Sequence, residues 1–202
     1  MKKILLLTVL LGLASCKSSN KTAQPAPESN EAAPETNEDK FVIENLTKFD
    51  AEKLKKNFPE ANIKEDVGMF EEGTEERAYS ILYPDTPNEI HITWADKDRT
   101  KINDIRFSEG GNWKSASGIK IGTTYEELNE LNGKPISFYG FGWDYSGAVM
   151  WNDGKFEDSN LRIFLAPKSS PAGKFYGDHI IKASPEEIAA LDLTVQTIIY
   201  KM

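Results

Sequence analysis

A repeated alternation of apolar and polar residues constrains the fold of this chain more than any other feature. In "EIHITWA" (89–95), Ile90, Ile92 and Trp94 fall on one face of an extended segment. His91 and Thr93 fall on the other face, which is the pattern of a strand with one buried side. Similar alternation predicts strands at about 78–83, 101–108, 136–145, 147–152, 160–166 and in the C-terminal "TVQTIIY".

Capping residues predict three short helices between these strands. Thr47 is expected to cap the first helix, and Thr124 with Glu127 has the spacing of a capping box for the second. Ser184 precedes a proline at the first helical position of the third. The helices are expected at about 48–57, 125–132 and 185–191.

Short helices and adjacent strands predict an α+β fold, with the helices packed on an antiparallel sheet. A helix comes before a group of strands in each half of the globular part, at about 41–115 and 116–202. The halves are therefore either a duplicated helix-plus-sheet unit in two subdomains or parts of one domain. No βαβ alternation and no nucleotide-type glycine loop occurs in the sequence.

The N-terminal segment determines where the protein is expected to work. Lys2 and Lys3 precede an apolar run at 4–13, which is too short to span a bilayer of ~30 Å and fits a secretory signal peptide. The run leads into "LASC", which is similar to a bacterial lipobox and contains the only cysteine, Cys16. The similarity implies a signal peptide at 1–15 and acylation of Cys16. An ordinary secreted protein with one thiol is the alternative.

Residues 16–40 are expected to be the lipidated cysteine followed by a disordered tether. Positions 17–40 contain no aromatic residue and no Val, Ile or Leu, so this segment cannot bury enough apolar surface to fold. Lys17 follows the cysteine, and lipoprotein sorting rules imply that a residue other than Asp there directs the protein to the outer membrane. We expect the body to face the periplasm. All 21 aromatic residues lie in 41–202, the predicted globular domain.

One stretch carries a resemblance to known proteins. "GIKIGTTYEELNELNGKPISFYGFGWDYSG" (118–147) resembles a family of Bacteroidota lipoproteins of unknown function and, more distantly, outer-membrane lipoproteins of the SmpA/BamE type. The latter share a fold with β-lactamase-inhibitor-protein-like domains. Gly122, Thr124, Leu128, Gly133 and Pro135 match the family spacing. The match departs from the family at Asn132, where an apolar residue is expected before the glycine.

The negative net charge of the chain restricts the kinds of partner that we expect. The formal net charge is −8, and removal of the signal segment would lower it to about −10 because Lys2 and Lys3 are lost. An acidic surface does not favour nucleic acid. We therefore expect no nucleic-acid partner, a membrane contact through the N-terminal lipid, and a protein or another envelope component as binding partner.

Aromatic residues beside glycines form the candidate binding surface. They can build a flat surface for a sugar, peptide or protein, or they can belong to the core. The candidates are Phe138, Tyr139, Phe141, Trp143, Tyr145 and Trp113.

No pattern of catalytic, cofactor or metal-binding residues occurs in the chain. His91 and His179 are the only histidines, and neither has metal-ligand partners at motif spacing. The acidic clusters at 71–76, 95–98 and 152–160 do not match a calcium loop, and "NDG" (152–154) predicts a tight turn. We therefore expect no cofactor and no metal.

These observations predict a non-enzymatic binding or interaction module in the cell envelope, anchored to the outer membrane. The alternatives are an envelope hydrolase that uses Asp or Glu residues and an inhibitor of a secreted hydrolase. An enzyme should bring carboxylates or His179 together in a deep pocket, whereas a binding module should expose an aromatic surface.

Overall fold

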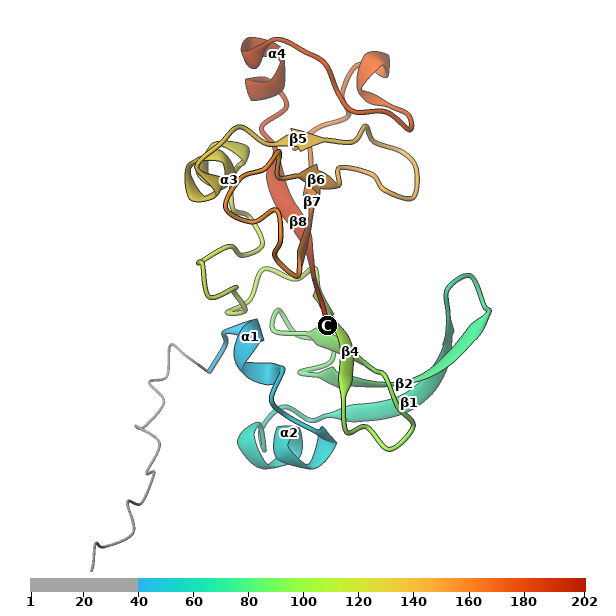
Figure 1. Ribbon diagram of the computed structural model, residues 1–202. Helices are drawn as coiled ribbons and strands as arrows, with labels where there is room; N and C mark the ends of the chain where they lie inside the picture. The colour runs from blue at the N-terminus through green and yellow to red at the C-terminus, as the bar shows by residue number, and fades with distance from the viewer. Residues whose placement is uncertain (1–39) are drawn as a thin grey trace, which may run out of the picture. The chain divides into compact units, whose positions relative to one another are not determined.

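The computed structural model describes residues 40–202, which belong to one compact unit (Figure 1). The predicted signal peptide, Cys16 and all of the predicted tether except Lys40 lie outside the described residues. The elements are α1 (Ile43–Leu46), α2 (Ala51–Asn57), β1 (Lys64–Phe70), β2 (Glu75–Leu82), β3 (Ile90–Trp94), β4 (Ile102–Phe107), α3 (Tyr125–Asn132), β5 (Ser137–Phe138), β6 (Val149–Met150), β7 (Leu161–Ala166), the 3₁₀ helix η1 (Gly173–Phe175), α4 (Pro185–Ala189) and β8 (Thr194–Lys201).

Within residues 40–202, six strands form one antiparallel sheet in the order β1-β2-β3-β4-β8-β7. β5 and β6 form a separate antiparallel pair. The α+β prediction is confirmed. Because β4 pairs with β8, the two predicted halves share one sheet, although β5 and β6 have no place in it.

Local capping chemistry sets both ends of α3 and the start of α4 as predicted, whereas α4 ends at Ala189 rather than at about 191. The Glu127 amide donates to the Thr124 hydroxyl at 3.2 Å, and the Thr124 amide donates to the Glu127 carboxylate at 2.8 Å. Gly133 then ends α3 with a left-handed φ of 72°. Ser184 and Glu187 form the equivalent box at α4. These bonds join residues three apart, so they need no partner from another element.

The predicted start of the first helix was wrong. The N-cap of α2 is Asp50, which accepts a hydrogen bond from the Lys53 amide at 2.8 Å. The Thr47 hydroxyl instead donates to the Glu44 carbonyl oxygen at 2.8 Å, at the end of α1. A carboxylate also matches the positive end of a helix, which favours Asp50 over Thr47 as the cap.

The predicted strand at 136–145 was also wrong beyond its first residues. The structure keeps β5 at Ser137–Phe138, and the chain then passes through turns that include Gly142, with φ 82°, and Gly147, with φ 72°. A left-handed backbone ends an extended strand and is favourable mainly for glycine. The strand predicted at 147–152 likewise shortens to β6.

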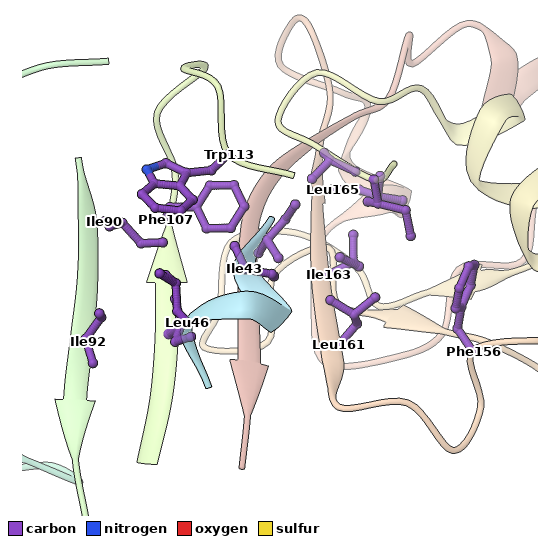
Figure 2. Close-up of a cluster of buried hydrophobic side chains, with 14 of the residues drawn as sticks. Ile43, Leu46, Ile90, Ile92, Phe107, Trp113, Phe156, Leu161, Ile163 and Leu165 are labelled. Carbon is purple, nitrogen blue, oxygen red and sulfur yellow. The ribbon is translucent and has the colours of Figure 1, made fainter. Parts of the chain in front are cut away.

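The core lies against one face of the main sheet (Figure 2). Ile90, Ile92 and Trp94 are each at most 1% exposed, as their alternation predicts. Ile43 and Leu46 of α1 belong to the same cluster and lie over β4 and β8 in the view. Further along the same face, β7 contributes Leu161, Ile163 and Leu165. The opposite face of β2, β3, β4 and β8 therefore remains for other contacts.

Asn132, at the position where the resemblance predicts an apolar residue, is buried at the end of α3. Its side chain is 1% exposed, and its Nδ2 donates to the carbonyl oxygens of Lys134 at 2.9 Å and Trp151 at 2.8 Å. Its Oδ1 accepts from the Phe156 amide at 3.3 Å. A Cβ on Gly154 would lie 2.1 Å from the Asn132 Nδ2, so this glycine makes room for the amide. Asn132 thus ties the helix end to the loop between β6 and β7.

Candidate functional site: a groove on the open face of the sheet

The structure divides the six predicted aromatic residues into two groups. Phe138, Phe141 and Trp113 are 1%, 5% and 1% exposed. Trp113 packs edge-on against Phe41 with ring centroids 5.0 Å apart, and Phe138 lies 5.9 Å from Phe141. These three side chains belong to the core, so their placement on a binding surface was wrong. Burying these large aromatic side chains removes apolar area from water and so stabilises the fold.

The other three aromatic residues form a connected cluster nearer the surface. The Trp143 ring lies 5.7 Å from that of Tyr139 and 5.2 Å from that of Tyr145. Tyr145 is 60% exposed, and the Trp143 indole N–H is held by the Gly140 carbonyl oxygen at 2.9 Å. A binding role for this cluster stays a prediction.

A second feature was not predicted: a groove of about 560 Å³ on the sheet face opposite the core. We call it the sheet-face groove. Side chains from β2, β3, β4 and β8 form its floor in two rows set by the strand register. The first row is Ile81, His91, Arg106 and Ile199. The second row is Tyr79, Thr93, Asp104 and Lys201. Its size lies in the range of small-molecule sites.

Apolar side chains concentrate on the β2 side of the groove. Phe70, from the end of β1, stacks edge-on against Tyr79 with ring centroids 6.1 Å apart. A Cβ on Gly68 would lie 3.1 Å from the Tyr79 ring, so glycine lets this ring lie close to the β1 backbone. Ile81 continues this surface along β2, and all three apolar side chains are partly exposed.

Two carboxylates in the groove already have hydrogen-bond donors. A Glu89 oxygen lies 2.8 Å from His91 Nε2, and the Asp85 amide donates to the other oxygen at 2.7 Å. The hydrogen bond with His91, followed by that with the Asp85 amide, lowers the pKa of Glu89 below its ordinary value. Glu89 is therefore charged at neutral pH, and both of its carboxylate oxygens have a hydrogen-bond partner.

Asp104 is engaged in the same way. It accepts a hydrogen bond from the Thr93 hydroxyl at 2.6 Å and another from Asn103 Nδ2 at 2.7 Å. Thr93 is only 6% exposed, so this bond also satisfies a buried hydroxyl. Within the described residues, neither carboxylate is held by a lysine or arginine.

Two cations in the groove, by contrast, have no partner among the described residues. The Arg106 and Lys201 side chains form no ion pair or side-chain hydrogen bond within 40–202, although Asp104 lies opposite Lys201 in the strand register. Both residues are exposed. The groove thus joins an apolar β2 side to a β4–β8 side with two available positive charges.

The remaining candidate residues lie elsewhere. His179 is exposed on the loop before α4 and does not line the groove. Asp96 accepts hydrogen bonds from the Thr100 and Lys101 amides and closes the β3–β4 loop. Asn152 and Asp153 have φ of 53° and 54°, as a tight turn requires. Within 40–202, no group of three His, Cys, Asp or Glu residues could hold a metal ion.

The groove could have been found in part from the sequence. Each strand alternates, so the positions opposite the apolar ones mark the second face, and His91 and Arg106 lie on it. Which of these positions meet depends on register, which the sequence does not state. In the part of the chain that the structure describes, no helix has the length and apolar character needed to cross a membrane.

Comparison with known proteins assigns no family. No family model matches the chain, and no curated protein does. Among solved structures the chain is similar to the uncharacterized protein yfeY from Escherichia coli, at 14% identity and a TM-score of 0.43. That alignment covers 73% of this chain and 88% of the other. The resemblance of residues 118–147 to lipoprotein families therefore stays a prediction.

Proposed function

We propose that this protein is a non-enzymatic binding module of the bacterial cell envelope, held to the outer membrane by an acylated Cys16 and facing the periplasm. The sheet-face groove is its contact site. The observation that carries the proposal is the open sheet face itself: β2, β3, β4 and β8 present partly exposed apolar side chains beside two unpaired cations. Exposed apolar surface next to charge is typical of interaction sites.

The polar groups of the groove favour binding over hydrolysis. A carboxylate that acts as general acid needs a raised pKa, whereas the pKa of Glu89 is lowered by its hydrogen bonds. Asp104 is held by two donors and lies on a floor that is open to solvent. Of the two histidines, His179 is not in the groove, and His91 in the groove is hydrogen-bonded to the charged Glu89.

Site-specific photocrosslinking in cells tests the binding role. A benzophenone amino acid would replace Tyr79 in the groove and, as a matched control, the exposed Lys56 on α2. We expect an adduct of reproducible mass from position 79 and none from position 56. A third variant at Tyr145 tests whether the exposed aromatic cluster contacts a partner as well. Equal adducts at positions 79 and 56, or none at position 79, would contradict the proposal.

A separate measurement tests the anchor. Cells labelled with an alkyne palmitate analogue should yield a labelled protein, and mass spectrometry should find Cys16 as its first residue. Cys16→Ser should remove the label and reduce the groove adduct, because the body would no longer be held at the membrane. An unlabelled protein that begins at another residue would refute the anchor without bearing on the groove.

A further inference from the structure

We infer that the sheet-face groove binds an amphiphilic monoanion, a small molecule with an apolar body and one singly charged head group. This inference rests on the proposed function and names the ligand class of the same site. It follows from the division of the groove into an apolar side over β2 and a side over β4 and β8 where two cations without ion-pair partners among residues 40–202, Arg106 and Lys201, lie beside Asp104.

The apolar body is placed by the side chains of β1 and β2. Phe70, Tyr79 and Ile81 form one partly exposed surface, on which Phe70 and Tyr79 are held edge-on. Covering this surface removes apolar area from water, at about 25 cal/mol per Å². The groove volume of about 560 Å³ suits a small molecule.

The head group is placed by Arg106. This side chain lies in the first row between His91 and Ile199, two strands away from Ile81. Lys201 stands on the neighbouring strand β8, in the second row. A guanidinium donates up to five hydrogen bonds and matches the geometry of an oxyanion, whereas an ion pair within the chain would have used these donors.

The other charged groups limit the ligand to one negative charge. Glu89 and Asp104 accept hydrogen bonds from other groups and form no ion pair with Arg106. Glu71 and Glu109 also line the groove and are exposed. A second negative charge on the ligand would meet these carboxylates, since like charges at short range repel. A monoanion on an apolar body therefore suits the groove better than a polyanion.

The test uses 8-anilinonaphthalene-1-sulfonate, an aromatic body with one sulfonate, and its neutral counterpart N-phenyl-1-naphthylamine. The protein is a soluble chain that begins at Lys17, so it lacks Cys16 and contains all of the described residues, 40–202. Fluorescence titration should show one sulfonate site per chain. Dodecanoate below its micelle concentration should displace the probe, and dodecyltrimethylammonium, with an alkyl chain one carbon longer and a positive head, should not.

Two charge reversals provide the matched comparison. Arg106→Glu should weaken sulfonate binding about tenfold or more, because a hydrogen bond to a charged group is lost. Arg162→Glu should change it less than about twofold, because Arg162 lies across from Ile199 in the same row but outside the groove. Binding of the neutral probe should be the same in both variants, which also shows that the groove has kept its shape.

Equal sulfonate binding by the wild type and Arg106→Glu would overturn the inference, as would no binding or an equal loss in Arg162→Glu. Such a result would not contradict the proposed function, because the crosslinks at position 79 test that function and do not depend on the charge of the ligand. If the crosslinks at position 79 are absent but sulfonate binding depends on Arg106, the partner proposal is contradicted and the small-molecule site is supported.

Discussion

Replacing Asn132 by leucine tests whether a buried amide is needed at the end of α3. Leucine has a similar size and is the kind of residue that the family spacing leads one to expect there. The Phe156 amide would lose its acceptor in a buried place, which costs about 1–3 kcal/mol. The Trp151 carbonyl oxygen would lose one donor and keep the Gly154 amide at 3.0 Å, at a cost of about 1 kcal/mol. The Lys134 carbonyl belongs to an exposed residue, where water can replace the lost donor.

Together these losses predict that Asn132→Leu lowers the free energy of unfolding by about 2–4 kcal/mol. For a domain of this size the midpoint of thermal unfolding should fall by about 5–15 °C. Urea unfolding of the soluble chain, followed by tryptophan fluorescence, measures the change. Asn57→Leu is the matched control because Asn57 is also the last residue of a helix, but its side chain is exposed and makes one bond, to the Lys53 carbonyl oxygen. The reasoning fails if the two variants lose the same stability, or if Asn132→Leu loses less than about 1 kcal/mol.

Three further substitutions test local parts of the fold. Thr124→Ala should cost about 1 kcal/mol in urea unfolding, because the α3 capping box loses its hydroxyl acceptor, and an unchanged midpoint would show that the cap contributes nothing. Gly147→Ala should destabilise the protein by more than Gly73→Ala, since a Cβ at position 147 would lie 1.9 Å from the Leu165 carbonyl oxygen while position 73 has free space; similar losses would mean that the backbone shifts easily. The pKa of Glu60 falls from its ordinary value of 4.5 to about 2, first through the hydrogen bond with Lys40 and then through that with Tyr83, so its contribution to stability is complete above about pH 4.5 and is lost as the pH falls toward 2. In Glu60→Gln the free energy of unfolding should therefore fall less steeply between pH 4.5 and 2 than in the wild type. Urea unfolding at pH 6, 4, 3 and 2 measures this, and equal slopes for the two proteins would contradict the prediction.

Sequence reasoning succeeded where neighbouring residues decide the structure. The boundaries of α3 follow from Thr124, Glu127 and Gly133, which interact within one helical turn of the end that each sets. The alternation at 89–95 predicted β3 because its apolar face packs against a core on one side only. In both cases a short stretch contains all the groups that determine the outcome.

Prediction failed where contacts with distant segments, rather than neighbouring residues, decide the structure. β1 was not predicted because most of its residues are exposed and it shows no alternation; it is a strand through its pairing with β2. At 136–145 the aromatic alternation was real, but Gly142 and Gly147 adopt left-handed turns that bring Gly147 against β7. Thr47 and Asp50 can both cap a helix. In the structure the Thr47 hydroxyl donates to the Glu44 carbonyl oxygen at the end of α1, and Asp50 caps α2.

By itself, the sequence determined the class of the fold, most of the helix ends and the buried face of the central strands, because these depend on contacts between residues close in the chain. It also contains the lipobox-like segment on which the anchor prediction rests. Only the tertiary structure decided the groove, which unites Ile81, Arg106 and Ile199 through the register of strands far apart in the sequence. It also decided which aromatic residues enter the core. Register and burial are set by competition among all the strands at once, and no single segment carries that information.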